Sequence, residues 1–239
     1  SSISSPAMRT CRARCTTTNR RTRLAQPRDA ASRWCALART SVRSWTLFRP
    51  TMIYGTETDL RDHNGEIVIS HDMPDRNNEL VTFESFLQIY KSNYDFYSQL
   101  PLALNVKADG LQEKAMNLII KYEVENYFFF DMSIPDHIMY EKINAKTYSR
   151  QSEYESSPTM YEISKGVWLD AFLGLWYDAK VIQDHLLQSK KVALVSFELH
   201  KRDNIEQWMF LKENNFHLNP NIILCTDFPE KAKIFFYEK

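Results

Sequence analysis

The chain has 239 residues, equal numbers of basic and acidic side chains, and a formal net charge of zero. Cys225 is the only cysteine after residue 50, so a disulfide framework is excluded there, and a reducing, cytoplasmic compartment is expected. The apolar runs are far shorter than the ~20 residues that cross a bilayer, so no transmembrane segment is expected.

The first 50 residues differ in composition from the rest. They contain 11 Arg, no Lys and one acidic residue, Asp29, which gives a formal charge of +10. Residues 51–239 hold 19 basic and 29 acidic side chains and carry −10. We therefore divide the chain into an Arg-rich head, residues 1–50, and a body, residues 51–239, that is long enough for one domain.

Three interpretations of the head compete. A basic nucleic-acid-binding tail usually mixes Lys with Arg and contains Gly, so no nucleic-acid partner is expected. A mitochondrial transit peptide fits the Arg- and Ser-rich, acid-poor composition. We favour a third interpretation, a frame-shifted or mispredicted start, because the residue usage changes abruptly. We expect residues 1–40 to be poorly ordered, because they show no helical or alternating period.

Strand-like and helical runs alternate along the body. Strands are expected at 54–59, 66–71, 102–107, 127–131, 146–150, 166–170, 192–198 and 222–227. Helices are expected at 83–94, 111–122, 134–140, 179–188, 203–214 and 229–237, the first of them capped by Thr82. This order predicts an α/β fold with a parallel sheet, and seven or eight units favour a (β/α)8 TIM-type barrel. An open doubly wound sheet remains an alternative.

The run Gly55–Arg61 ends in two carboxylates, and a second short run ends in His71-Asp72. Glu57 and Asp59 lie on one face of a strand, about 7 Å apart, because side chains alternate. Two hard carboxylates suit Mg²⁺ or Ca²⁺, and a nearby imidazole suits proton transfer. Glu-x-Asp alone is more often a salt-bridged strand.

Nearly every strand-like run ends in polar side chains. In a barrel these carboxyl ends meet at one mouth, where active sites are built. Single residues have structural explanations, since Asp131 and Asp227 suit helix N-caps and His200 suits a loop. Eight such endings together predict a polar pocket. They are Glu57 and Asp59; His71 and Asp72; Asn105 and Lys107; Asp131; Arg150; Trp168 and Asp170; Glu198 and His200; Thr226 and Asp227.

The body resembles the glycerophosphodiester phosphodiesterase family and related phosphatidylinositol-phospholipase-C-like barrels over roughly residues 53–237. The family's Glu-x-Asp, Gly and His-Asp look like Glu57, Asp59, Gly65, His71 and Asp72. Its Glu-x-Lys looks like Asn105-Val106-Lys107. Its closing Thr-Asp-x-Pro looks like Thr226-Asp227-Phe228-Pro229.

Two departures from the family bear on activity. The family's first strand ends in His-Arg-Gly, which supplies a second catalytic imidazole, and no such tripeptide occurs here. Asn105 replaces the family's third metal carboxylate, so metal affinity should fall unless Asp109 or Asp170 compensates. The lost first unit predicts an incomplete barrel with a gap between the 54–59 and 222–227 strands.

The resemblance implies a metal-dependent phosphodiester hydrolase acting on a small glycerophosphodiester-like or sugar-linked diester. The implied Mg²⁺ or Ca²⁺ ligands are Glu57, Asp59 and Asn105. The implied catalytic residues are His71 and Lys107, and the implied substrate-binding residues are Arg150, Trp168, Glu198 and His200. The alternative is a catalytically impaired barrel that keeps only an anion-binding mouth. A Schiff-base aldolase or isomerase using Lys107 leaves Glu57, Asp59 and His71 unexplained.

Overall fold

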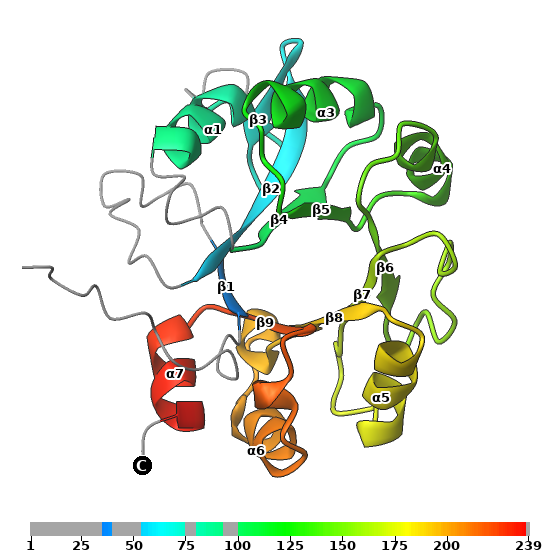
Figure 1. The fold of residues 1–239 in the computed structure, drawn as a ribbon. Helices are drawn as coiled ribbons and strands as arrows, with labels where there is room; N and C mark the ends of the chain where they lie inside the picture. Colours follow the sequence, from blue (N-terminus) through cyan, green and yellow to red (C-terminus); the bar gives the residue numbers. More distant parts are fainter. Residues whose placement is uncertain (1–34, 40–53, 75–79, 93–99, 238–239) are drawn as a thin grey trace, which may run out of the picture. The chain divides into compact units, whose positions relative to one another are not determined.

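A computed structural model describes residues 35–39, 54–74, 80–92 and 100–237, all of them within a compact unit from Ala31 to Lys239. Strands alternate with helices, and the helices lie outside a ring of strands (Figure 1). The strands are β1 (Cys35–Arg39), β2 (Gly55–His63), β3 (Glu66–Ile69), β4 (Leu102–Val106), β5 (Tyr127–Phe130), β6 (Tyr148–Gln151), β7 (Gly166–Leu169), β8 (Lys191–Val195) and β9 (Ile222–Thr226). The helices are α1 (Phe83–Ser92), α3 (Gln112–Lys121), α4 (Ile134–Lys142), α5 (Ala179–Leu187), α6 (Ile205–Glu213) and α7 (Pro229–Tyr237), with short 3-10 turns η2 (Phe197–His200) and η3 (Phe216–Leu218).

The sheet is parallel apart from one hairpin. Its hydrogen-bonded order is β5-β4-β2-β1-β9-β8-β7-β6, and β3 pairs antiparallel with β2. The hairpin turns at Asn64-Gly65, which both have positive φ, as a two-residue turn of this kind requires. This TIM-type order confirms the predicted (β/α) barrel architecture, including its incomplete closure.

The predicted position of the gap is wrong. β1 comes from the Arg-rich head and pairs in parallel with β2 on one side and β9 on the other. It therefore fills the space where a missing strand was expected. Apart from β1, the expected disorder of residues 1–40 concerns a segment outside the described residues.

The sheet is weakest between β5 and β6, which we call the seam. Among the described residues, one isolated bridge, Phe129 to Thr147, joins these strands, and Phe129 N donates to Lys146 O over 2.8 Å. Side chains supply the remaining contacts across it. The Phe128 and Tyr148 rings stack at 3.8 Å between centroids, nearly parallel at 10°.

Side-chain alternation divides the apolar residues into layers. On β5, Tyr127 and Phe129 pack outward against the layer beneath α1, α3 and α4, whereas Phe128 and Phe130 point into the barrel. Inside, Phe130 stacks on Trp168 at 3.8 Å between centroids. A second outer layer lies beneath α5, α6 and α7. The barrel is therefore filled with side chains below its mouth, as small barrels are.

Gly166 meets a steric requirement of this interior. A Cβ there would lie 2.6 Å from both Lys191 O and Tyr148 Cζ, which is too close for any side chain. Glycine at the start of β7 thus lets the Tyr148 ring pack against the strand.

Among the described helices, none is both long enough and apolar enough to traverse a bilayer. Helices α4 and α5 each begin with a side-chain N-cap. Ser133 Oγ accepts from Asp136 N before α4, and Asp178 Oδ1 accepts from Val181 N before α5.

Candidate active site at the barrel mouth

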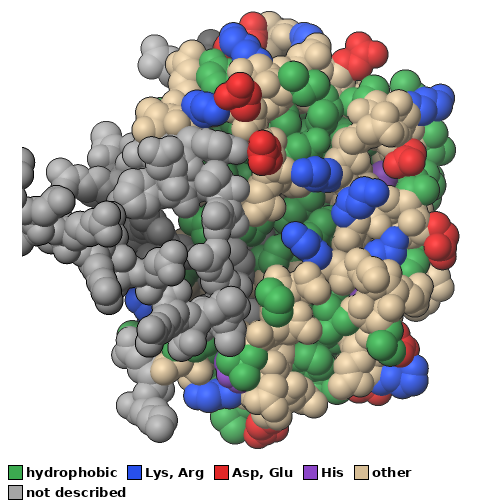
Figure 2. All heavy atoms as spheres, in the orientation of Figure 1, with side chains coloured by type: hydrophobic (Ala, Val, Ile, Leu, Met, Phe, Trp, Pro, Cys, Tyr) green, Lys and Arg blue, Asp and Glu red, His purple; other side chains and the backbone are tan. Residues whose placement is uncertain are grey.

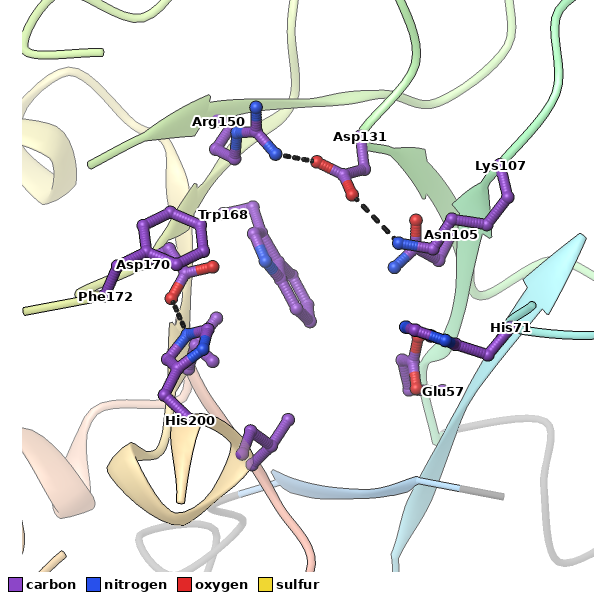
Figure 3. Close-up of a pocket in the computed structure, with 12 residues that line it drawn as sticks. Glu57, His71, Asn105, Lys107, Asp131, Arg150, Trp168, Asp170, Phe172 and His200 are labelled. Atoms are coloured by element: carbon purple, nitrogen blue, oxygen red, sulfur yellow. Dashed lines mark hydrogen bonds and ion pairs between the residues drawn. The ribbon is translucent and has the colours of Figure 1, made fainter. Parts of the chain in front are cut away.

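A cavity of about 320 Å³ opens where the carboxyl ends of the strands meet (Figure 3). Nine of the strand-end residues singled out from the sequence line it: Glu57, His71, Asn105, Lys107, Asp131, Arg150, Trp168, Asp170 and His200. The lining also includes Phe172, Val195 and Leu199. Residues as distant in sequence as Glu57 and His200 thus share one polar pocket, as the strand-end pattern predicts.

One wall of the cavity is a chain of alternating charges. Lys107 Nζ lies 3.2 Å from Asp131 Oδ2 and 3.8 Å from Asp59 Oδ1. Arg150 forms ion pairs with Asp131 and with Glu155. Burial lowers the pKa of Arg150, but Glu155 and Asp131 outweigh burial and raise it above its usual value. Both cations are therefore held at the mouth by carboxylates before any anion arrives.

Two histidines face the cavity from opposite sides (Figure 3). His200 Nε2 lies 2.6 Å from Asp170 Oδ1, whose side chain is only 8% exposed. The carboxylate can only accept, so Nε2 carries the proton and Nδ1 is left to exchange a proton with a bound molecule. His71 is more open, with its Nδ1 2.8 Å from Asp72 Oδ1. Each imidazole thus has a carboxylate partner.

Whether a divalent cation fits at the mouth depends on three buried side chains. Glu57, Asp59 and Asn105 are 3%, 4% and 8% exposed, and Asp59 and Asn105 are paired in the β2–β4 register. No hydrogen bond reaches the buried Asn105 Oδ1 from the described residues. A buried amide oxygen beside two carboxylates is a hard donor set that suits Mg²⁺ or Ca²⁺ in type. Among the described residues, however, no group of three or more His, Cys, Asp or Glu side chains is arranged to hold a metal.

Two predicted site residues do not line the cavity. Asp59 is not among the lining residues, but its Oδ1 lies 3.8 Å from the Nζ of Lys107, which lines the cavity. Glu198 is occupied by local structure: its carboxylate bonds Ser196 and Thr226 side chains, accepts from Asp227 N at 3.1 Å, and from Asn204 Nδ2 at 3.0 Å. Glu198 thus lies at the junction of η2 and β9, and its role in substrate binding stays a prediction.

Asp109 and Asp170, considered as substitutes for the missing metal carboxylate, are engaged elsewhere. Asp109 Oδ1 accepts from Ser133 Oγ at 2.9 Å near the start of α4. Asp170 binds His200 across the cavity from Glu57 (Figure 3). Neither residue joins Glu57 and Asn105.

The sequence placed Asp131 in the predicted polar pocket without its ion-pair partners, and it did not mark Phe172 as a site residue. Asp131 follows β5 and was recognisable as a strand-end carboxylate, but its pairing with both cations depends on neighbouring strands. Phe172 lies beyond β7 and packs on His200 at 4.7 Å between ring centroids. No pattern in the sequence marks an aromatic side chain in such a loop as part of a site.

The chain shares its fold with solved glycerophosphodiester phosphodiesterases. It is similar to the glycerophosphodiester phosphodiesterase from Agrobacterium tumefaciens str. C58, with a TM-score of 0.56 and 10% identity over 81% of this chain and 96% of that one. It is also similar to a glycerophosphoryl diester phosphodiesterase from Parabacteroides distasonis ATCC 8503, with a TM-score of 0.59 and 11% identity over 87% of each chain. No protein-family model and no curated protein matches the sequence. At such low identity the likeness confirms the predicted resemblance at the level of the fold.

Proposed function

We propose that the barrel mouth binds and hydrolyses a small phosphodiester, with His71 and His200 as the proton-transferring groups. The observation that carries the proposal is the convergence of two carboxylate-bonded imidazoles with Lys107 and Arg150 on one cavity. Phosphodiester hydrolysis needs proton transfer at the attacking and leaving oxygens and positive charge on the phosphate. The fold shared with glycerophosphodiester phosphodiesterases supports the same reaction class.

Because the two histidines lie on opposite sides of the cavity, a separate imidazole is available for each of the two proton transfers (Figure 3). In-line displacement at phosphorus places the attacking and leaving oxygens on opposite sides of the phosphate. One neutral imidazole takes the proton of the attacking hydroxyl, and the other, protonated, donates to the departing alkoxide. Lys107 and Arg150 hold the phosphate oxygens between them, and Arg150 can do so through two N–H groups.

The charge of the lining favours a metal cofactor. Among the described residues, Glu57, Asp131 and Asp170 line the cavity with only Lys107 and Arg150 as fixed cations. An anionic diester adds further negative charge, which a divalent cation would offset. Glu57, Asp59 and Asn105 would hold that ion, and it would supply charge neutralisation at phosphorus and lower the pKa of a bound hydroxyl.

Hydrolysis of bis(4-nitrophenyl) phosphate and of glycerophosphodiesters by the full chain tests the proposal, with Mg²⁺, Ca²⁺ or chelator present. Turnover of glycerophosphodiesters, whose alkoxide leaving group needs a proton, should fall about 10²–10⁴-fold in His200→Ala and in His71→Ala, the usual range for a general acid or base. His63→Ala, at the end of β2 and outside the cavity, should keep parental turnover. Equal activity in His200→Ala and His63→Ala would refute the assignment.

The alternative function is an anion-binding mouth without turnover. The observation that favours it is the pairing of both cations with Asp131, and of Arg150 also with Glu155. An impaired barrel of this kind binds phosphate weakly and releases no alcohol from a diester. Phosphate binding by calorimetry, together with no turnover under any metal condition, would select this alternative.

A further inference from the structure

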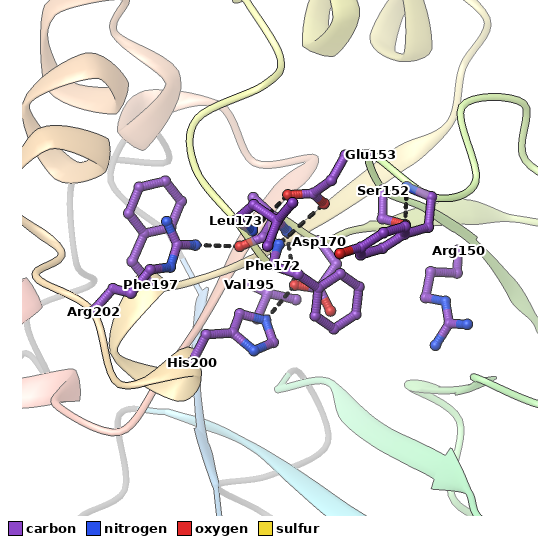
Figure 4. Close-up of polar contacts among 12 residues, drawn as sticks. Arg150, Ser152, Glu153, Asp170, Phe172, Leu173, Val195, Phe197, His200 and Arg202 are labelled. Atoms are coloured by element: carbon purple, nitrogen blue, oxygen red, sulfur yellow. Dashed lines mark hydrogen bonds and ion pairs between the residues drawn. The ribbon is translucent and has the colours of Figure 1, made fainter.

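We propose that Glu153 is a positioning residue, which holds the Phe172 ring against the imidazole of His200. The proposal rests on the proposed function, because it concerns the placement of the histidine that moves a proton there. Figure 4 shows Glu153 reaching from the segment after β6 to the loop after β7 that carries Phe172.

The contacts of the Glu153 carboxylate define its role. Its Oε2 accepts from Phe172 N at 3.0 Å, and its Oε1 accepts from Leu173 N at 2.7 Å. Burial raises the pKa of Glu153, but the backbone N–H groups that it accepts outweigh burial and leave the pKa lowered. The ionised carboxylate therefore fixes two successive peptide groups of a loop whose Leu173 side chain is 71% exposed.

Glu153 is itself held in a tight turn. Ser152 and Glu155 exchange two backbone hydrogen bonds, of 3.3 and 3.1 Å, around Glu153 and Tyr154. The same turn brings the Tyr154 ring to 5.8 Å from the Phe172 ring. One turn thus supplies both a carboxylate for the loop backbone and an aromatic neighbour for its side chain.

Other residues hold the loop at different atoms. Trp176 Nε1 donates to Asp170 O at 2.7 Å, and Arg202 donates to Ala171 O. These bonds secure carbonyl groups at the end of β7. Among the hydrogen bonds of the described residues, those that secure the backbone of Phe172 and Leu173 themselves come from Glu153.

Phe172 links the loop held by Glu153 to the imidazole of His200. Its ring centroid lies 4.7 Å from that of His200 at an interplanar angle of 48°. The bond from Nε2 to Asp170 holds one edge of the imidazole, and Phe172 limits how far the ring can turn about that bond. Together they keep Nδ1 directed at the cavity, so loosening the loop should cost catalysis through misplacement.

NMR of the full chain tests the contact directly, because the Phe172 ring current shifts the ring protons of His200. Glu153→Ala should move the His200 resonances toward their position in Phe172→Leu, and Glu153→Gln should lie between parent and Glu153→Ala. Glu162→Ala, which removes an exposed carboxylate from the same β6–β7 connection, should leave them unchanged. With bis(4-nitrophenyl) phosphate, kcat of Glu153→Ala should fall about tenfold with KM within about twofold.

His200 resonances that are identical in Glu153→Ala, Glu162→Ala and the parent would overturn the proposal. If Glu153→Ala does not fold, as circular dichroism would show, Glu153→Gln decides in its place by the same comparison. A parent chain without phosphodiesterase activity would refute the proposed function, whereas the resonance comparison would still decide the role of Glu153.

Discussion

Asn105 lies directly beside Asp59 in the parallel register of β2 and β4. Asn105→Asp would place a third carboxylate next to Glu57 and Asp59, and we expect it to raise the affinity for Mg²⁺ or Ca²⁺. A tenfold gain in affinity corresponds to about 1.4 kcal/mol of added stabilisation at a fixed, saturating metal concentration. Thermal unfolding with and without metal measures the gain.

Matched replacements control the metal prediction. Glu57→Gln should abolish the metal-dependent rise in Tm, because it removes a hard anionic donor at the same site. A parent chain and an Asn105→Asp variant with identical metal-dependent shifts would exclude Asn105 as a ligand.

Asp131 pairs with both cations of the mouth, so its removal should leave each of them with one carboxylate fewer to compete with a bound anion. Asp131→Asn is expected to tighten binding of inorganic phosphate and to lower the stability by about 1 kcal/mol, since the ion pairs are partly exposed. Isothermal titration and chemical denaturation measure the two effects. Glu155→Gln, which removes one of the two partners of Arg150 and none of Lys107, should show a smaller gain in phosphate affinity than Asp131→Asn.

Asp170→Asn keeps the shape of the side chain but removes the charge that orients His200. Turnover should fall about 10²–10⁴-fold if His200 acts as the general base, because the preferred ring tautomer is lost. Turnover of Asp170→Asn equal to that of the parent would contradict the role of the pair.

His185 makes folding stability depend on pH. Its ring is buried between Tyr161 OH, at 2.9 Å, and Gln151 Oε1, at 2.7 Å, and burial lowers its pKa below its ordinary value of 6.5. The unfolded chain therefore binds more protons, so stability is complete above pH 6.5 and is lost as the pH falls from 6.5 toward the lowered value. His185→Gln should reduce the fall in Tm across this window. His63→Ala should keep the parental fall, and equal pH dependence in both variants would contradict this account.

Gly166→Ala should destabilise the barrel by about 1–3 kcal/mol, because the added Cβ collides with Lys191 O and the Tyr148 ring. Gly174→Ala is the matched control, since a Cβ there meets nothing within 4 Å. Its stability should stay within about 0.5 kcal/mol of the parent. Equal free energies of unfolding for the two variants, measured by chemical denaturation, would contradict the packing account.

The barrel and most of its mouth could be predicted from the sequence because each relies on a local pattern. Strand-like runs such as Leu102–Lys107 end in polar residues, and parallel strands necessarily bring those ends together. The position of Glu198 outside the cavity lining has a local reason. Strand β8 ends at Val195, and Phe197–His200 is a 3-10 turn, so the two-residue alternation of a strand no longer determines where Glu198 and His200 point.

The remaining differences depend on contacts that no local pattern encodes. β1 is five residues long and lies in a segment of unusual composition, and its pairing with β2 and β9 is a long-range interaction. Phe172 joins the site because Glu153, 19 residues earlier in the chain, holds the loop after β7. Such relationships become visible only once strands that are distant in sequence lie side by side.

The seam between β5 and β6 lies directly beneath the groups proposed to grip phosphate. Asp131 follows β5 and Arg150 belongs to β6, so their ion pair spans the junction where, in the described part of the chain, one isolated backbone bridge joins the two strands. An anion that draws Arg150 away from Asp131 would remove one of the links between these two strands. Ligand binding and the opening of the seam between β5 and β6 are then thermodynamically coupled. The pocket can therefore widen most easily beside the Asp131–Arg150 ion pair.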